Sequence, residues 1–454
     1  MRPLIATLIC LLFIAYIFWT DRDRKEGPYN ALWIPFLWMF FAGGRSLAEW
    51  LHMGSPGGTP SAYDQGNPIN AAFTFLLIAA GIFILSRRNI DWGQFISKNK
   101  LIWLYLLYCL ISILWSDYSY VSFKRWTKEV GNLAMVLVIL TEERPSEAFG
   151  YLIRRLSFLW LPLSVLFIKY YPALARGYAP GGGMMYTGVA TQKNGLGQLC
   201  LICAIFYAWH YLLASKDDFK FGGRDNIVDL ILIGMLIWLF HMAQSATSFT
   251  CAIAAVTLFG AGRLTAGKPG RIMTWAVVAA LLFFALNSAF NLKDAVIHML
   301  GRKPNLTDRT HIWAIVGQMA ANPWVGAGYQ GFWLGHRLKV LWGEIGMNII
   351  QAHDGYLEQY LDLGYIGVAF IIAIMFSGIL KVRRQLYRDY PTGVLMLCLI
   401  LVAALYNYTE ASFYAISNIW LLLVLAVTEI PEQGQAHEKA SAMQRMHLEK
   451  RPCS

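Results

Sequence analysis

The stretch PINAAFTFLLIAAGIFILSRR (68–88) decides the fold class of this protein. It holds nineteen residues without a charged side chain, and Arg87 and Arg88 follow directly. A helix of about 20 apolar residues crosses the roughly 30 Å hydrocarbon core of a bilayer. Inside that core a helix satisfies its own backbone polar groups, whereas an open strand does not. The stretch therefore predicts a transmembrane helix with a basic anchor at one end.

Apolar runs of this kind recur along the whole chain of 454 residues. Hydrophobic residues make up 57% of the sequence and charged residues only 14%, which is unlike the composition of soluble domains. We expect spans near residues 3–19, 31–44, 68–86, 101–115, 130–141, 151–168, 196–214, 226–243, 246–262, 272–290, 356–380, 391–408 and 412–429. The sequence therefore predicts an all-α polytopic membrane protein with about 12–13 transmembrane helices.

The loops between these runs differ in their content of basic residues. One alternating set of loops carries 24 of the 38 Lys and Arg residues. It consists of residues 20–30, 87–100, 142–155, 215–225, 262–271, 381–388 and the tail from 430. Because Lys and Arg collect in cytoplasmic loops, we expect this set in the cytoplasm, with the N-terminus outside and the C-terminus inside. Arg2 favours the alternative of 12 spans with both ends inside.

This topology divides the chain into four regions. Residues 1–290 hold the N-terminal transmembrane helices, and residues 291–355 form a large outer loop with short amphipathic helices. Residues 356–430 hold the C-terminal transmembrane helices, and residues 431–454 form a polar cytoplasmic tail with a composition typical of disorder. We expect two further outer loops, at 116–129 and 169–195.

The composition also excludes several classes of function. The net charge of +11 does not indicate nucleic-acid binding, because the basic residues lie in short loops between apolar runs. The CxxC pair Cys200 and Cys203 lies within one apolar run without a second pair of ligands, so we expect no metal site and no disulfide framework. The sequence has no complete Walker loop, no GxSxG and no HExxH.

Basic residues nevertheless gather in the three outer loops. They are Lys124, Arg125, Lys128, Lys169, Arg176, Lys193, Arg302, Lys303, Arg309, Arg337 and Lys339. The positive-inside bias disfavours cations on that side, so a group of them indicates an anion-binding site at the membrane surface. Contact with lipid headgroups, or plain solvation, is the alternative for any single member.

Two stretches of the large outer loop contain candidate catalytic residues. In NLTDRTHIWAIVGQMAANPWVGAGYQGFW (305–333), apolar side chains at helical spacing predict an amphipathic helix with Arg309 in its first turn, followed by a glycine-rich loop. In QAHDGYLEQYLDLGYIGVAF (351–370), His353 and Asp354 stand where the loop enters a span, with Glu358 one turn further on. An imidazole titrates near neutral pH, so His353 is a candidate general base.

Taken together, these stretches resemble the bacterial O-antigen ligase and polysaccharide polymerase superfamily. HDGYLEQYLDLGYIG (353–367) is similar to the family's His, small polar residue, nine residues and Gly-x-x-Gly, with Asp354 where Asn, Ser or Gln is usual. TDRTHIWAIV with NPWVGAGYQGFW (307–333) is similar to the family's Arg-x-x-x-Trp helix and glycine-rich loop. ATQKNGLGQ (190–198), WSDYSYVSFKRWTKEVG (115–131) and AQSATSF (243–249) also resemble family segments. Many ligases have an Arg near the last stretch, and its absence favours the exopolysaccharide-production polymerase branch.

The resemblance implies a glycosyltransferase C-type fold and a donor linked to undecaprenyl diphosphate, with no metal, nucleotide sugar or other cofactor. His353 and Arg309 would be catalytic, with Asp354 or Glu358 orienting His353. The diphosphate and the sugars would contact Arg125, Lys124, Lys193, Asn194, Trp313 and Tyr356. Arg suits a diphosphate because its planar fork pairs with two oxygens.

The expected activity is polymerisation of lipid-linked oligosaccharide repeat units at the periplasmic face of the bacterial inner membrane. The expected partners are the lipid-linked oligosaccharide, the bilayer, a chain-length regulator and export proteins, without nucleic acid. Ligation of finished polymer to a lipid A core or another acceptor is the nearest alternative. Transport of lipid-linked sugars is a second one, disfavoured because transporters place charges near the bilayer midplane and often contain internal repeats.

Overall fold

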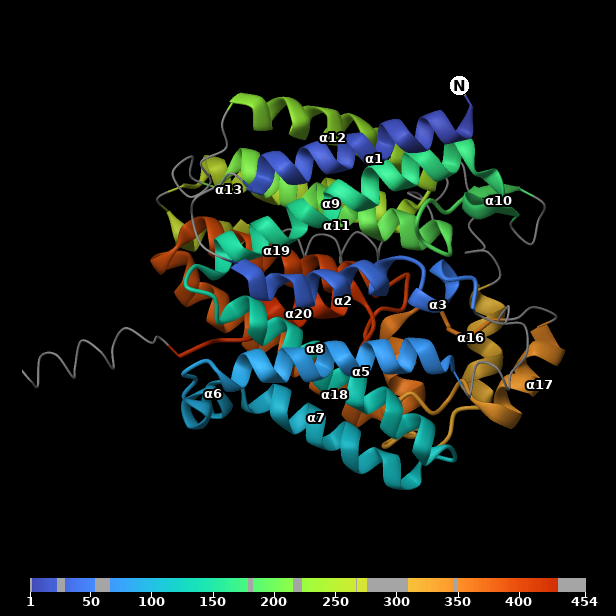
Figure 1. Ribbon diagram of the computed structural model, residues 1–454. Helices are drawn as coiled ribbons and strands as arrows, with labels where there is room; N and C mark the ends of the chain where they lie inside the picture. The colour runs from blue at the N-terminus through green and yellow to red at the C-terminus, as the bar shows by residue number, and fades with distance from the viewer. Residues whose placement is uncertain are drawn as a thin grey trace, which may run out of the picture.

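The computed structural model describes residues 2–22, 29–53, 66–178, 183–214, 223–266, 268–275, 309–345 and 349–431. Over these residues the chain is a bundle of long helices that lie side by side and run between two ends, left and right in Figure 1. The two strands that the described part contains, β1 (Arg176–Tyr178) and β2 (Met184–Tyr186), form a short antiparallel hairpin. The expected all-α architecture is therefore confirmed.

The helices take the following bounds. The first part of the chain forms α1 (Pro3–Arg22), η1 (Tyr29–Leu32), α2 (Trp33–Gly43), α3 (Leu47–Trp50), α5 (Pro68–Ser86), α6 (Trp92–Lys98), α7 (Lys100–Ser112), η2 (Ile113–Trp115) and α8 (Ser119–Leu140). Then come α9 (Pro145–Tyr170), α10 (Pro172–Ala175), α11 (Lys193–Leu212), α12 (Gly223–Ala243) and α13 (Ala246–Leu264). The last are α16 (Arg309–Gln318), α17 (Gly335–Ile345), α18 (Gly355–Arg388), α19 (Tyr390–Tyr406) and α20 (Asn418–Val427).

Seven of these helices are long and apolar enough to cross a membrane, namely α1, α5, α9, α11, α12, α13 and α18. The bent pair formed by α6 and α7 makes an eighth candidate, and α2, α19 and α20 are shorter apolar helices. Helix α8 has spanning length but begins with a charged segment. Most of the span expected at 272–290 lies outside the described residues. The chain is thus a polytopic membrane protein.

Polar contacts separate the loops into two groups, one at each end of the bundle. At one end, His353 contacts Glu410, and Arg125 contacts the loop at Gln330. At the other end, Lys98 pairs with Glu429. These groupings follow the two alternating sets of loops expected from the basic residues. Figure 1 shows α3, α10, α16 and α17 near the N-terminus at the His353 end, and α6 at the opposite end.

Burial differs strongly between the helices. Apolar residues of α9, α11 and α20 form the centre of the core, and every residue of α20 is buried. In contrast, only 11% of the spanning window of α1 and 17% of that of α5 is buried inside the protein. Their outward side chains are apolar, as in Leu8 and Phe75. Such faces are stable against lipid rather than water, which fits their place at the edge of the bundle.

Helix α18 is broken at Gly364, about two and a half turns after its start, and the break attaches the glycine-rich loop to it. Gly364 has φ 65° and ψ −165°, a conformation that side chains other than hydrogen disfavour. The backbone N–H of Tyr365 donates to Pro323 O at 2.9 Å, and that of Ile366 donates to Trp324 O at 3.3 Å. A Cβ at Gly364 would lie 2.2 Å from the Trp324 carbonyl. The glycine-rich loop thus occupies the gap in the helix.

Candidate functional site: a histidine and a carboxylate at one end of the bundle

His353 lies in a backbone conformation that the surrounding structure enforces. Its φ is 55°, which is uncommon and strained for a residue other than glycine. On one side, Ala352 O accepts from Trp313 Nε1 at 2.8 Å. On the other side, Asp354 caps α18, because its Oδ1 accepts from the backbone N–H groups of Tyr356 and Leu357 at 3.0 Å. The backbone at His353 is therefore held in place through both of its neighbours in the chain.

The ring of His353 meets Glu410, a residue of the loop between α19 and α20. Nδ1 lies 3.1 Å from Glu410 Oε2. The other carboxylate oxygen, Oε1, accepts from Asn194 Nδ2 at 2.8 Å. The side chain of His353 is 24% exposed and that of Glu410 is 7% exposed. The three residues form a chain from the first turn of α11 to the start of α18, with the imidazole at its accessible end.

This contact determines which nitrogen of the imidazole can act as a base. An ionised carboxylate only accepts hydrogen bonds, so Nδ1 of His353 is the donor toward Glu410. A neutral ring then carries its lone pair on Nε2. The Gln351 side-chain amide lies 3.4 Å from the same Nδ1, a longer contact than that to Glu410. Glu410 therefore holds the tautomer in which Nε2 can accept a proton.

Glu358 supports the segment before His353 from the inside. Its Oε2 accepts from Trp333 Nε1 at 2.6 Å, and its Oε1 accepts from the backbone N–H of Ala352. From the sequence, Asp354 or Glu358 was expected to orient His353. In the structure the contact with the ring comes from Glu410, while Asp354 caps the helix and Glu358 joins the glycine-rich loop to residue 352.

Arg125 and Lys124 lie on α8 beside the glycine-rich loop. The Arg125 guanidinium donates to Gln330 O, and the Lys124 ammonium lies 4.9 Å from the centre of the Tyr120 ring. The neighbouring Tyr329 donates its hydroxyl to Glu129 Oε2 at 3.0 Å. Burial raises the pKa of this phenol well above its usual value, so it stays protonated as a donor. The contacts of Arg125 with Gln330 and of Tyr329 with Glu129 thus both hold the glycine-rich loop against α8.

The remaining expected site residues lie around the same end. Lys193 and Asn194 open α11, and Arg309 is the first residue of α16, four residues before Trp313. The side chain of Arg309 lies outside the described residues. Tyr356 donates its hydroxyl to Ala404 O at 3.2 Å and packs edge-on against Phe413. The structure therefore brings Asn194 and Trp313 to the His353 segment, and gives Tyr356 a packing contact with α19.

The serine- and threonine-rich stretch 243–249 borders the site. Thr247 and Thr409 share a hydrogen bond of 2.6 Å, and Thr409 directly precedes Glu410. Gly197 of α11 packs so closely here that a Cβ would lie 2.5 Å from Ser245. The start of α13 thus lies against the loop that carries Glu410, and small residues permit the approach.

Glu410 is a site residue that was not predicted from the sequence. It stands in NYTEASFY (407–414), a short polar interruption between two apolar runs. An ionisable residue at such a boundary is a functional candidate by default, and this signal was available. Its partner was not visible, because 57 positions separate it from His353 and 216 separate it from Asn194.

The fold and these side chains define a polytopic membrane protein with a buried carboxylate behind an accessible histidine at one end. Residues 230–372, which include Arg309, Trp313 and His353, match the family model described as O-antigen ligase. This region of the chain is therefore similar to O-antigen ligases, and the match supports the superfamily of O-antigen ligases and polysaccharide polymerases. No curated protein matches the sequence. The family supports an enzymatic, glycosyltransferase-like role in ligation or polymerisation of lipid-linked sugars.

Proposed function

We propose that this protein polymerises oligosaccharide repeat units linked to a polyprenyl diphosphate, with undecaprenyl diphosphate as the bacterial carrier lipid. The observation that carries the proposal is the His353–Glu410–Asn194 chain at one end of a membrane bundle. A base held in one tautomer, beside a surface able to receive a lipid-linked anion, is what glycosyl transfer without a nucleotide sugar needs. The family match of the region around His353 supports the same class of reaction.

The proposed transfer forms one glycosidic bond and breaks one bond to the diphosphate. A hydroxyl of the acceptor sugar gives its proton to His353 Nε2, while its oxygen bonds to the anomeric carbon of the donor sugar. The bond between that carbon and the diphosphate oxygen breaks, and the polyprenyl diphosphate leaves with the bonding electrons. Attack opposite to the leaving group inverts the configuration at the anomeric carbon. General-base assistance of this kind contributes about 10²–10⁴-fold to the rate.

The surroundings of His353 favour a negatively charged leaving group. Helix α11 begins at Lys193, and its first turn lies at the Glu410 loop, where Asn194 contacts the carboxylate. The N-terminal end of a helix carries about half a positive charge, which stabilises a nearby diphosphate. Lys193 adds a cation there, and Arg309 is proposed as a second one. Such fixed charges stabilise the transition state because they need no reorganisation during the reaction.

The stretch 243–249 favours polymerase over ligase. It adjoins the Glu410 loop through Thr247 and Thr409, and it contains no Arg. An Arg in the corresponding stretch is expected for many ligases on the family resemblance. Ligation to a separate acceptor therefore remains the second candidate, with the same bond-forming step and a different acceptor.

We further propose that the chain lies in the bacterial inner membrane with the His353 end toward the periplasm. The excess of Lys and Arg in the loops of the opposite end supports this orientation. A chain-length regulator and export proteins are proposed partners, because a polymer made on that face must be measured and exported.

The test is a reconstituted reaction in proteoliposomes with a polyprenyl-diphosphate-linked repeat unit, without nucleotide or added metal. The wild-type protein is expected to give a polymer ladder and free polyprenyl diphosphate, and His353→Ala is expected to give neither. His336→Ala is the matched control, because this exposed histidine lies at the same end of the bundle, at the start of α17. Release that requires a separate acceptor would favour ligase. No release from any lipid-linked donor would refute glycosyl transfer.

A further inference from the structure

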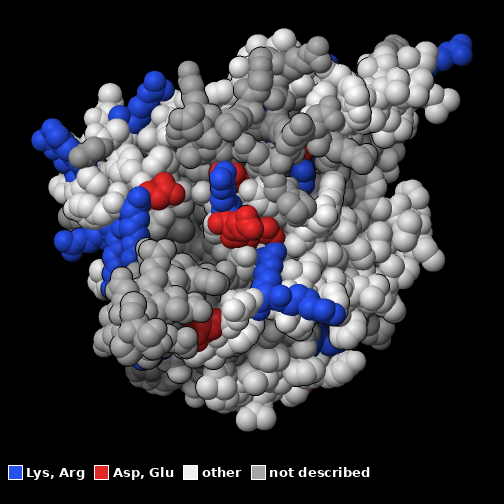
Figure 2. All heavy atoms as spheres, turned by 60° about the vertical axis from the view of Figure 1, so that its left-hand side comes forward, with Lys and Arg blue, Asp and Glu red and all other residues white. Residues whose placement is uncertain are grey.

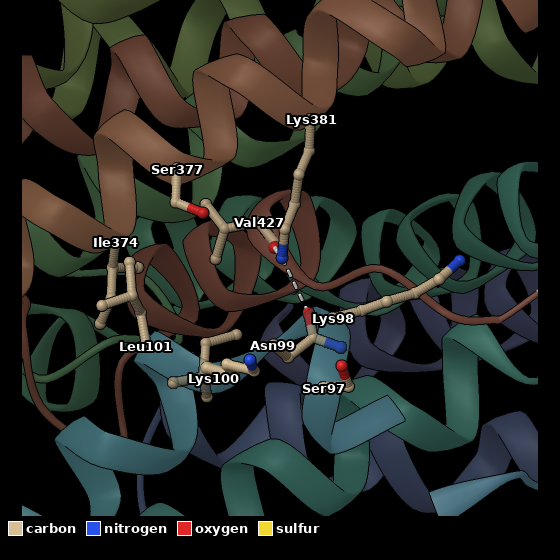
Figure 3. Close-up of a pocket in the computed structure, with 10 residues that line it drawn as sticks. Ser97, Lys98, Asn99, Lys100, Leu101, Ile374, Ser377, Lys381 and Val427 are labelled. Atoms are coloured by element: carbon tan, nitrogen blue, oxygen red, sulfur yellow. Dashed lines mark hydrogen bonds between the residues drawn. The ribbon is translucent and has the colours of Figure 1, made fainter. Parts of the chain in front are cut away.

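A cavity of about 100 Å³ lies at the opposite end of the bundle, away from His353. It opens where α6, α7 and α18 meet, close to the end of α20 (Figure 3). Its lining residues are Ser97, Lys98, Asn99, Lys100, Leu101, Ile102, Ile374, Ser377, Lys381 and Val427. Nothing in the proposed glycosyl transfer uses this cavity.

The bend between α6 and α7 sets the depth of the cavity relative to a membrane. The two helices meet at Asn99 with an angle of 87° between them. When α7 crosses the bilayer, α6 therefore runs along its surface. The exposed Trp92 and Ile96 of α6 fit the boundary between headgroups and acyl chains, where amphipathic helices lie. Asn99 and the cavity beside it are then at the level of the lipid headgroups.

The lining of the cavity changes from apolar to cationic along its depth. Ile374, Ser377 and Lys381 follow one face of α18 at spacings of three and four residues. Ile374 lies toward the middle of the bundle, and Lys381 lies toward its end. Leu101 of α7 adds a second apolar side chain on the inner side, as Figure 3 shows. A phospholipid has the same order of polarity, with acyl chains inward and phosphate outward.

Cations dominate the polar side of the cavity. The Lys381 ammonium donates to Asn99 Oδ1 and to Val427 O, each at 2.9 Å. These two hydrogen bonds use two of its three N–H donors and fix the position of the ammonium group. Lys98 pairs with Glu429 at 2.9 Å, which leaves Lys100 and Lys381 as excess positive charge. Figure 2 shows Lys and Arg side chains spread across this end of the molecule, with fewer acidic ones between them.

A second, open groove lies on α18 near the same end. Its lining consists of Leu380, Arg383, Arg384 and Tyr387, which places two more cations beside two apolar side chains. Leu380 is 51% exposed and Tyr387 is 66% exposed. The two arginines add to the positive charge at this end of α18.

From this geometry we propose that the cavity binds the phosphodiester headgroup of an anionic phospholipid, with Lys381 and Lys100 facing the phosphate and Ser377 hydrogen-bonded to it. Basic pockets between transmembrane helices are suited to anionic headgroups. The bound lipid fastens the α6–α7 bend to α18. The proposal is independent of the glycosyl transfer at the other end.

Native mass spectrometry of the full chain in detergent tests the site. The measurement compares the retention of phosphatidylglycerol with that of phosphatidylcholine, both with identical acyl chains. The wild-type protein is expected to retain phosphatidylglycerol at least about tenfold more tightly. Lys381→Gln is expected to lower this preference about fivefold, the usual contribution of one cation near anionic lipid. Ser377→Leu fills the cavity without changing its charge and is expected to remove the preference. All variants are first compared with the wild type in elution profile and unfolding temperature.

Arg263→Gln is the matched control, because Arg263 is an exposed cation in the last turn of α13, at the same end of the bundle. It is expected to leave the preference for phosphatidylglycerol unchanged. An equal loss of the preference in Arg263→Gln and Lys381→Gln would mean that general surface charge causes it. Equal retention of both lipids by the wild type would refute the proposed site. Displacement of phosphatidylglycerol by excess inorganic phosphate would identify a soluble phosphate as the ligand and overturn the lipid assignment. If Lys381→Gln does not fold, unchanged lipid preference in Ser377→Leu refutes the proposal.

Discussion

Replacing Glu410 by Gln tests the alignment of His353 with a change of one atom. The carboxylate accepts from Asn194 Nδ2 through Oε1 and from His353 Nδ1 through Oε2. A Gln side chain keeps the shape and the acceptor for Asn194, but places an amide N–H opposite Nδ1. Two donors then face each other unless the imidazole moves its proton to Nε2. In that tautomer Nε2 has no lone pair for the acceptor hydroxyl.

The size of the effect follows from the hydrogen bond that is lost. A hydrogen bond to a charged group contributes about 1.5–3 kcal/mol, which corresponds to about 10–150-fold in rate. The turnover number for polymer formation should fall by this factor in Glu410→Gln, and by about 10²–10⁴-fold in His353→Ala. The KM for the lipid-linked donor should stay close to that of the wild type, because the carboxylate is only 7% exposed and lies behind the imidazole.

The assay is polymer formation in proteoliposomes at saturating and limiting donor, with the unfolding temperature measured on the same preparations. Glu410→Asp is the companion variant, because it keeps the charge and is expected to recover part of the lost rate. Full activity in Glu410→Gln would refute the positioning of His353 by Glu410. So would an activity loss that follows the unfolding temperature in both variants, because that pattern reports a structural role alone.

Three further outcomes are expected. Gly364→Ala should lower the free energy of unfolding by at least about 2 kcal/mol, because its Cβ would lie 2.2 Å from the Trp324 carbonyl and its φ is 65°. The control Gly234→Ala has open space around the new Cβ and should not destabilise the protein, so equal unfolding temperatures of the two variants would contradict this prediction. Arg154→Met leaves two buried aspartates without their shared guanidinium and should lower the free energy of unfolding by about 3–5 kcal/mol. The control Arg144→Gln changes an exposed arginine and should lower it by at most about 0.5 kcal/mol, so equal losses in denaturant unfolding would argue against a buried network. EDTA should leave the polymerisation rate unchanged, because fixed cations stabilise the leaving diphosphate, and a rate restored by added magnesium would show the opposite.

The fold class was accessible from local sequence. The length and hydropathy of runs such as 68–86 predict spanning helices, since each run satisfies its own backbone inside a bilayer. The alternation of basic loops also predicted which loops share an end of the bundle. Contacts such as Arg88 with Glu142 and Lys98 with Glu429 agree with that grouping.

Parts of the candidate site were accessible as well. His353 at the start of a span and Trp313 in the preceding helix were both expected near the site from the sequence, and the structure joins them through Ala352. The role expected for Glu358 was the orientation of His353. Glu358 instead accepts from the Trp333 indole, because the glycine-rich loop folds back onto α18 and brings that indole to it.

The sequence by itself determined the kind of molecule, its two ends and the residues that deserve mutation. Hydropathy and charge act on consecutive residues, so they can be read along the chain. Only the tertiary structure decided that Glu410 lies between His353 and Asn194, and that the loop at Trp324 occupies the break at Gly364. Both depend on how helices distant in sequence pack together, and such packing brings side chains into contact without leaving a local pattern in the sequence.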